Sequence, residues 1–201
     1  MIEKETFGRR QQAIEQFRRS AGSPQLFGKS QQLADYWFNL KKSGLLPEKK
    51  TINPRDLQSL LPQIVMLERD EAGLFKVRLS GTGITELWGI EPTGKEFLAH
   101  AALQNRDKVQ SLLQSALQQP CGLIMRYDDL YTDGRLIQTE FALFPIRMSA
   151  NQTQILFGVI SAADHEEQSW PQPLLATAFY RIKNFQFVSV GGGTPTPADD
   201  C

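Results

Sequence analysis

Residues 107–146, DKVQSLLQSALQQPCGLIMRYDDLYTDGRLIQTEFALFPI, contain the clearest structural pattern of the chain. The first part of this stretch predicts an amphipathic helix, because apolar residues recur at the spacing of one helix face and Pro120 lies just beyond the end. These residues are Val109, Leu112, Leu113, Ala116 and Leu117. Two segments rich in apolar and β-branched residues follow, 122–127 and 136–146, separated by the turn-forming residues 131–134. We therefore expect a helix followed by an antiparallel hairpin.

Further strands are expected on both sides of this stretch. Residues 154–162 form another apolar segment after a turn at 149–151. Toward the N-terminus, 64–67 is a short apolar run, and FKVRLS at 75–80 alternates apolar and polar side chains as a half-buried strand does. The turn residues at 70–73 between these two segments predict a second hairpin.

Helices are expected before and between these strands. One helix ends near Ser43 and Gly44 and has a single apolar face, made of Leu33, Tyr36, Trp37 and Leu40. Asn53 followed by Pro54 favours a second, short helix that stops near Pro62. Glycines break residues 81–98 into several helical turns. This order predicts an α+β fold with a five-stranded antiparallel sheet, helices on one face, and N-terminal flanking helices.

Four regions are expected along the chain. Residues 1–29 are read as an N-terminal flanking helix, either a dimerisation or membrane-surface element or a solvated helix that packs loosely. Residues 30–165 form the main domain, and 166–190 a C-terminal extension that packs on it. Within the extension, 174–182 could be helix or strand, and Phe185, Phe187 and Val190 suggest a short closing strand. The glycines and prolines of 191–201 predict a disordered tail.

Composition restricts the function classes. The 201 residues are 41% hydrophobic and 22% charged, as in soluble globular proteins. Lys plus Arg and Asp plus Glu each total 22, so no overall field attracts nucleic acid or anionic lipid. No apolar run approaches the ~20 residues of a membrane span, and the N-terminus lacks the apolar core of a signal peptide. Two cysteines, Cys121 and Cys201, form no disulfide framework, so we expect a cytoplasmic protein.

Several motifs resemble those of a known family. They are Asp35-Tyr36-Trp37, Gly44-Leu45-Leu46-Pro47, Asn53-Pro54, Leu60-Leu61-Pro62, Phe75-Lys76-Val77-Arg78-Leu79-Ser80-Gly81-Thr82, Trp88-Gly89 and Pro92-Thr93-Gly94-Lys95. In spacing and in the order of elements the chain resembles a family of small bacterial PAS-domain proteins, over about residues 31–165. The resemblance implies a PAS fold and a sensory or regulatory role.

The resemblance also raises two cofactor questions. PAS oxygen sensors bind haem through a helical histidine, and His100 follows the segment that would form the wall of the PAS cavity. The alternative is a capping or surface histidine. The flavin-binding cysteine of light-sensing PAS domains lies in an Asn-Cys-Arg motif that this chain lacks, so Cys121 is read as a small buried apolar residue. We predict no cofactor, with haem through His100 as the alternative.

No metal site is predicted. His165 is followed by two glutamates but has no further histidine or cysteine nearby, and it is read as the solvated end of a strand. Asp128, Asp129 and Asp133 cluster around the predicted hairpin, where carboxylates bond their own backbone.

A cavity is the remaining candidate site. In a PAS fold the inner sheet face and the short helices can enclose a pocket. The residues expected to line it are Leu87, Trp88, Phe97, Leu98, His100, Met125, Ile137, Phe141 and Phe157. The apolar members of this set would equally form a filled core, so a small apolar ligand is permitted but not required.

We therefore expect a non-catalytic PAS-like sensory or regulatory module that acts through protein–protein contacts, with an unknown signalling partner. A carrier or isomerase-like enzyme is one alternative, for which Tyr127 and Glu140 are the nearest candidates, although strand alternation places Glu140 on the face opposite Phe141. A structural subunit of a larger assembly is another. Leu136 and Phe144 on the outer sheet face need cover from the N-terminal helix or a second subunit, so we expect a homodimer.

Overall fold

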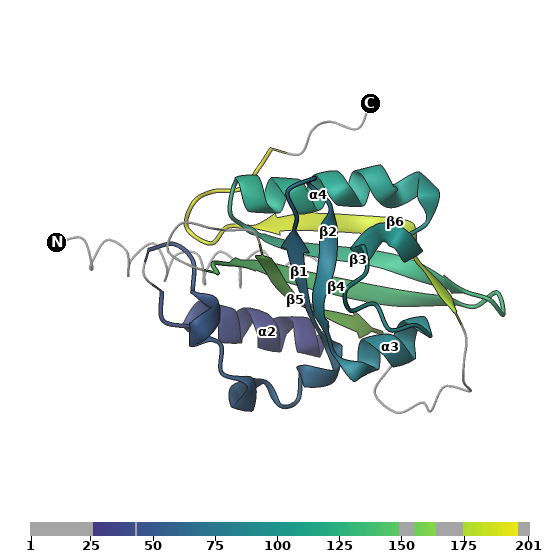
Figure 1. The fold of residues 1–201 in the computed structure, drawn as a ribbon, viewed down its shortest axis with the longest axis horizontal. Helices are drawn as coiled ribbons and strands as arrows, with labels where there is room; N and C mark the ends of the chain where they lie inside the picture. Colours follow the sequence, from purple (N-terminus) through teal and green to yellow (C-terminus); the bar gives the residue numbers. More distant parts are fainter. Residues whose placement is uncertain (1–25, 43, 149–154, 164–174, 197–201) are drawn as a thin grey trace.

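A six-stranded antiparallel sheet forms the centre of the computed structural model, which describes residues 26–42, 44–148, 155–163 and 175–196 (Figure 1). The strands are β1 (Ile64–Arg69), β2 (Phe75–Ser80), β3 (Gly122–Tyr131), β4 (Leu136–Ile146), β5 (Ile155–Ala162) and β6 (Ala176–Val188). Their order across the sheet is β2-β1-β5-β4-β3-β6, and every neighbouring pair is antiparallel. The predicted α+β class is confirmed, and the predicted count of five strands is one too low.

The additional strand is β6, which pairs along β3. From the sequence, the first part of this segment could be a helix or a strand, because its pairing with β3 is irregular. The register shifts between Arg126 and Tyr127 and again between Asp128 and Leu130. Such bulges interrupt the two-residue alternation by which a strand is recognised. Side chains of β6 that join the inner core therefore do not alternate: Ala176, Ala178, Phe179, Ile182, Phe185 and Phe187.

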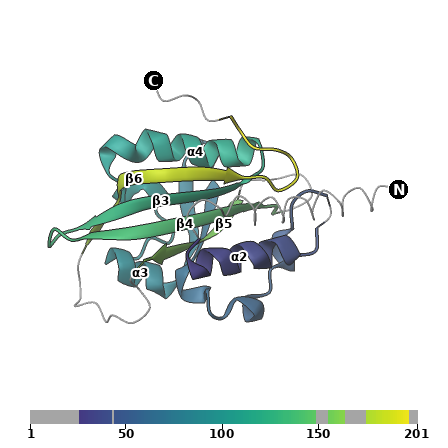
Figure 2. The ribbon, with the colours of Figure 1, turned by 180° about the vertical axis from the view of Figure 1, so that it is seen from behind.

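The outer face of the sheet is covered by α2 (Gly28–Asn39), which lies across β4 and β5 (Figure 2). Of its predicted apolar face, Leu33 and Trp37 are buried in the outer core, Tyr36 is half-buried, and Leu40 follows the end of the helix. The Trp37 ring stacks on Phe144 with centroids 5.4 Å apart, and its indole N–H donates to the carbonyl oxygen of Pro145 at 3.1 Å. The cover expected for Phe144 thus comes from a helix of the same chain.

The inner face is covered by the segments between β2 and β3. They are α3 (Thr82–Trp88), η4 (Phe97–His100), η5 (Leu103–Asn105) and α4 (Arg106–Gln118). All five predicted apolar positions of α4 are buried. Gln110, next to the buried Val109, is half-buried and its amide donates to the carbonyl oxygen of Gly73 at 2.7 Å.

Short 3-10 turns connect α2 to the sheet, namely η1 (Lys49–Thr51), η2 (Pro54–Leu57) and η3 (Leu61–Gln63). Asn53 caps the second turn, because its side chain accepts from the N–H of Arg55 at 3.2 Å. The helix expected here is therefore a pair of short turns, because Pro54 and Pro62 each restrict the backbone to a few residues of helix.

The sheet separates two cores. The inner core lies against α3, η4 and α4, and the outer core lies against α2. Alternation along β5 sends Leu156 and Ile160 to the inner core and Phe157 and Val159 to the outer one. No helix in the described ranges has the length and apolar character that a bilayer span needs.

Some expectations fall outside the described residues. These are the N-terminal flanking helix up to residue 25, His165, Cys201, residues 166–174 of the C-terminal extension, and the tail from residue 197. Of the tail expected from 191, residues 191–196 are described, and the N–H of Gly191 donates to Ser189 Oγ at 3.3 Å.

Candidate functional site

Aromatic rings fill the inner core between the sheet and the short helices. They belong to Trp88, Phe97, Tyr127, Phe141 and Phe179. The centroid of Phe97 lies 6.0 Å from that of Trp88, 5.5 Å from Phe141 and 5.7 Å from Phe179. The Tyr127 and Phe179 centroids are 4.1 Å apart. Rings at these separations are in contact, so side chains occupy the space that a ligand would need.

The structure assigns most predicted pocket residues to this inner core. Seven of them are buried there: Leu87, Trp88, Phe97, Leu98, Met125, Ile137 and Phe141. Phe157 is an error in the prediction, because alternation along β5 places it in the outer core under α2. When both faces of a sheet are covered, apolar residues occur on both, so residue type alone does not show which face a side chain occupies.

His100 lies at the end of η4 and is half-buried. Its Nε2 has no hydrogen-bond partner in the described part of the chain. Burial, followed by the charges of Lys95 and Arg106, lowers its pKa. A haem or flavin does not fit in the inner core beside His100. The rings of Phe97 and Phe141, which are in contact, and the residues around them fill the space that a planar cofactor would occupy.

Asp129, expected from the sequence to bond its own backbone at the hairpin, is instead a buried ionisable group with partners distant in sequence. Its side chain has no exposed surface; one carboxylate oxygen accepts from Thr139 Oγ1 at 2.9 Å and the other from the N–H of Phe179 at 3.2 Å. Burial raises its pKa to about 7, against the lowering effect of these hydrogen bonds. Strand alternation could have found it, because Tyr127, Asp129 and Tyr131 share the inner face.

The other two aspartates of this region make ion pairs: Asp133 is partly exposed, whereas Asp128 is buried. Asp133 serves the hairpin turn as expected, accepting from the N–H and from Nε of Arg135 at 3.1 and 2.6 Å. Asp128 lies on the opposite face from Asp129 and pairs with Lys183 at 2.7 Å. Among the described residues, no group of three or more His, Cys, Asp or Glu side chains is arranged to hold a metal ion.

Two buried polar groups near Asp129 lack hydrogen-bond partners within the described ranges, the Tyr127 hydroxyl and the Trp88 indole N–H. Burial raises the pKa of Tyr127, and the Asp129 charge raises it further. The Trp88 indole N–H also lowers the pKa of the Asp129 carboxyl group, although it makes no hydrogen bond of normal geometry with any described residue. Chemically, the cluster can hold or release one proton near neutral pH inside an apolar core.

Phe179 links this cluster to the edge of the sheet. Its φ of 53° places it in the left-handed region, which side chains rarely adopt. Two contacts hold it there: its N–H donates to Asp129, and its carbonyl oxygen accepts from Asn105 Nδ2 at 2.7 Å. A change at Asp129 therefore acts directly on the backbone of β6.

Glu140 lies on the outer face, as alternation predicted, yet it is fully buried. Its carboxylate accepts from Nε and Nη2 of Arg126, each at 2.7 Å, and from the N–H of Phe27 at 2.9 Å. These contacts make Glu140 a fixed anchor for the start of α2. Cys121 is also buried, and burial raises the pKa of its thiol to about 12, which keeps it protonated.

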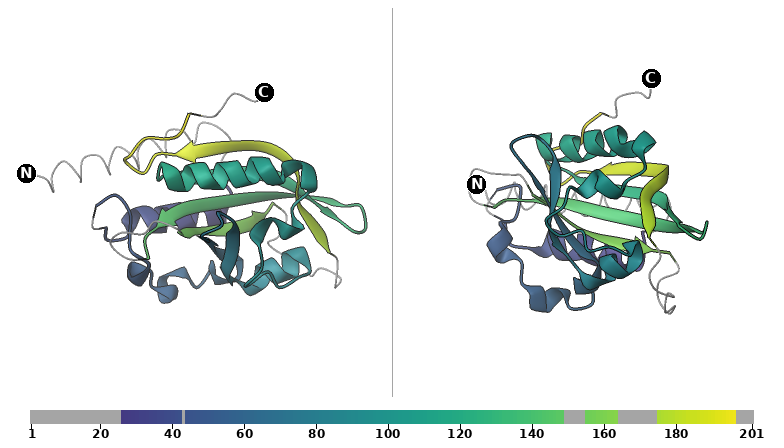
Figure 3. Two further views of the ribbon diagram at one scale, coloured as in Figure 1. Left: turned by 45° about the horizontal axis from the view of Figure 1, so that its top comes forward. Right: turned by 45° about the vertical axis from the view of Figure 1, so that its right-hand side comes forward.

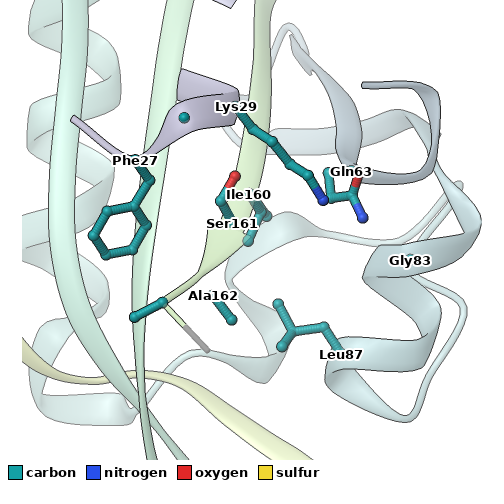
Figure 4. A pocket seen from close by; sticks show the side chains of 10 residues that line it. Phe27, Lys29, Gln63, Gly83, Leu87, Ile160, Ser161 and Ala162 are labelled. Atoms are coloured by element: carbon teal, nitrogen blue, oxygen red, sulfur yellow. The ribbon is translucent and has the colours of Figure 1, made fainter. Parts of the chain in front are cut away.

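A pocket of about 220 Å³ opens elsewhere, between the start of α2, η3, α3 and the end of β5 (Figure 4). Of the predicted lining residues, Leu87 alone contributes to it. Seven of the predicted residues, Leu87 included, are buried in the inner core, Phe157 lies in the outer core, and His100 is half-buried.

Comparison with solved structures finds weak similarity to PAS and light-oxygen-voltage proteins. An RNA-binding light-oxygen-voltage receptor is 18% identical with a TM-score of 0.45, over 61% of this chain and 36% of the receptor. The Rhodobacter sphaeroides LOV protein is 8% identical with a TM-score of 0.43, over 57% and 70% of the two chains. A PAS domain from Colwellia psychrerythraea is 14% identical with a TM-score of 0.41, over 55% and 97%.

Comparison with curated proteins gives no match. The family comparison does: the PAS domain family matches residues 28–161, which extend from the start of α2 to the end of β5 and include every element that covers the inner core. The match spans well over half of the chain and agrees with the observed order of helices and strands. The chain belongs to the PAS domain family.

Proposed function

We propose that this PAS domain is a sensory or regulatory module that acts through protein–protein contacts and catalyses no reaction of its own. The observation that carries the proposal is an apolar patch on the outer face of the sheet, at the end where β3 turns into β4. Leu136 is 42% and Leu175 is 51% exposed there, beside the half-buried Leu130. We call these three residues the hairpin patch.

The strand register supports placing the three leucines on one face. Leu130 pairs directly with Leu136, and across β6 it pairs with Thr177. The N–H of Thr132 donates to the carbonyl oxygen of Leu175 at 3.1 Å, so Leu175 lies two residues further along the same ladder and on the same face. The hairpin extends from the body of the domain (Figure 3), where a partner can reach it.

Charges lie beside the patch on the same strands. Asp128 pairs with Lys183 at 2.7 Å and approaches Arg181 at 3.8 Å. An apolar centre next to charged groups is the usual arrangement of a protein interface. A second copy of this chain is the first partner we propose, in addition to a signalling protein in the cytoplasm.

The core supplies a route from the interior to this surface. Asp129 binds the backbone of Phe179 in β6, and β6 follows directly after Leu175. A change in the hydrogen bonding of Asp129 would therefore move the edge strand beside the patch. A small apolar ligand could act on the same cluster only by displacing one of the packed rings.

Affinity capture tests the proposal. The tagged full-length chain, a Leu136→Glu/Leu175→Glu variant and a control with an exposed leucine changed elsewhere, Leu74→Glu, are incubated with native lysate. We expect the wild type and the control to retain the same partner and the double variant to lose it, at unchanged melting temperatures. Equal capture by all three proteins would contradict a role for the patch.

Asp129 favours a second candidate, a carrier or isomerase-like enzyme, because a buried acid with a raised pKa suits proton transfer. Such an enzyme would require solvent and substrate to reach the carboxyl group of Asp129. Exchange of the Trp88 indole proton discriminates, since Nε1 is buried in the same cluster. Exchange within minutes would favour the enzyme, and exchange as slow as that of core amides would favour the module. The third reading, a structural subunit, predicts that the native protein sediments within a large assembly.

A further inference from the structure

The pocket at the start of α2 lies outside the aromatic core and is formed by four segments that are distant in sequence (Figure 4). Gly28 and Lys29 begin α2, Gln63 ends η3, Leu87 comes from α3, and Ser161 lies near the end of β5. Its volume of about 220 Å³ is below the ~300–1,000 Å³ of sites for drug-sized ligands. Only a small molecule fits.

One wall of the pocket is the N-terminus of a helix of 12 residues. The first intrahelical hydrogen bond runs from the N–H of Gln31 to Phe27, so the N–H groups of Gly28, Lys29 and Ser30 have no acceptor within the described ranges. The Phe27 side chain makes no capping bond, and the first turn contains no acidic residue. Free N–H groups and the helix dipole favour an anion at this position.

Lys29 and Ser161 match that preference, and Gln63, also in the lining, has a buried Oε1 with no partner among the described residues. Lys29 extends from the helix toward Gln63 (Figure 4), and no ion pair in the described part of the chain includes it. Ser161 is only 6% exposed, lines the pocket, and its Oγ has no hydrogen-bond partner there. A buried hydroxyl without a partner costs free energy, which a ligand oxygen could recover.

The nearest acid does not oppose an anion. Glu140 pairs across the strands with Ser161 and lies on the same face. Its charge is balanced by two contacts from Arg126 at 2.7 Å and by the N–H of Phe27 at 2.9 Å. The positive charge of Lys29 is therefore the uncompensated one at the pocket.

The rest of the wall is apolar, formed by Leu87, Ile160 and Ala162 beside the Phe27 ring. We propose that this pocket binds a short-chain carboxylate. The head group accepts from the α2 N-terminus, Lys29 and Ser161, and the short apolar tail contacts Leu87 and Ile160. Binding here involves neither the hairpin patch nor Asp129, so it can be measured whether or not the proposed partner contacts exist.

Titration of the isotope-labelled full-length chain with sodium butyrate, followed by amide NMR, tests the proposal. We expect saturable shifts at Gly28, Lys29 and Ser30. Butyramide, which has the same tail but no charge, and inorganic phosphate, which has charge but no tail, should bind at least about tenfold more weakly, since each lacks one half of the contacts. Equal affinity for either control probe, or no shift with butyrate, overturns the proposal.

Two variants and a matched control locate the site. Lys29→Gln and Ser161→Ala should each weaken butyrate binding, the first by about tenfold or more because a charged donor is lost. Lys41→Gln changes an exposed lysine beyond the other end of the same helix and should leave the affinity unchanged. Melting temperatures check folding. If all three variants bind as the wild type does, the site is elsewhere and the proposal fails.

Discussion

At the scale of single residues, Asp129 gives the most specific prediction. Burial raises the pKa of its carboxyl group from 3.8 to about 7 in the folded protein. Between those pH values the folded protein keeps a proton that the unfolded chain has released, so the free energy of unfolding decreases as pH rises through this range. Above about pH 7 both states are ionised and this contribution is constant.

We expect Asp129→Asn to remove this slope. At ~1.4 kcal/mol per pH unit, the wild type should lose up to roughly 4 kcal/mol relative to the variant between pH 4 and pH 7. Urea denaturation at pH 4.5, 6 and 7.5 measures the difference. The control is Asp133→Asn at the hairpin turn, whose carboxyl pKa is lowered instead, mainly by the backbone N–H of Arg135. Parallel pH profiles for the wild type and Asp129→Asn would show that Asp129 does not titrate in this range.

Phe141 tests the packing of the aromatic core. Its ring has no exposed surface and contacts Phe97, with centroids 5.5 Å apart. Phe141→Ala should destabilise the fold by ~3–5 kcal/mol, because the methylene and ring contacts are lost and a cavity remains. Leu79→Ala, at an exposed position of β2, is the control and should cost far less. A loss below about 1 kcal/mol for Phe141→Ala in urea denaturation would indicate that the core is not packed as described.

At the scale of elements, α4 tests the docking of helix on sheet. Leu113 is fully buried against the inner core, so Leu113→Asp should cost several kcal/mol by burying an unpaired charge. Ser111→Asp, on the exposed side of the same helix, is the matched control. Gln110 is unsuitable as a control, because its amide bonds Gly73. Equal melting temperatures for the two variants would exclude the helix-on-sheet arrangement.

Elements with regular periodicity were predictable from sequence, and irregular ones were not. The apolar spacing of α4 fits only a helix, and the alternation of β2 fits only a strand. Both elements were therefore expected where they occur. The bulges in the β3–β6 pairing hid the first part of β6, while Phe185 and Phe187 near its end were expected in a strand. Both faces of the sheet are covered, which made the side of Phe157 ambiguous. Strand alternation would have placed Asp129 on the inner face. Its position close to a turn led instead to the prediction that it serves the hairpin.

The pocket at the start of α2 could not be predicted from sequence periodicity. Its polar groups come from α2, η3 and β5, and nothing in the local sequence of Lys29 or Ser161 indicates that they approach one another. Only tertiary packing leaves the Ser161 hydroxyl buried without a partner. Sites of this kind appear when the chain is assembled in three dimensions.

In the whole molecule, the packing of the two cores determines which parts of the sheet remain free for contact with a partner protein. The flanking helix α2 covers Phe144 and the centre of the outer face, so that face is unavailable there to a second copy. Among the described residues, the hairpin patch at Leu136 and Leu175 is exposed apolar surface on the outer face that α2 does not cover. A homodimer of this domain is therefore expected to form through the hairpin patch.

Sedimentation equilibrium tests most directly the claim that this PAS domain works through contacts at the hairpin patch. We expect the full-length chain to be a dimer at micromolar concentration and Leu136→Glu/Leu175→Glu to be a monomer. Leu74→Glu, at an exposed leucine outside the patch, should behave as the wild type. A wild-type chain that remains monomeric at high concentration, or a double variant that dimerises as tightly as the wild type, would contradict this claim.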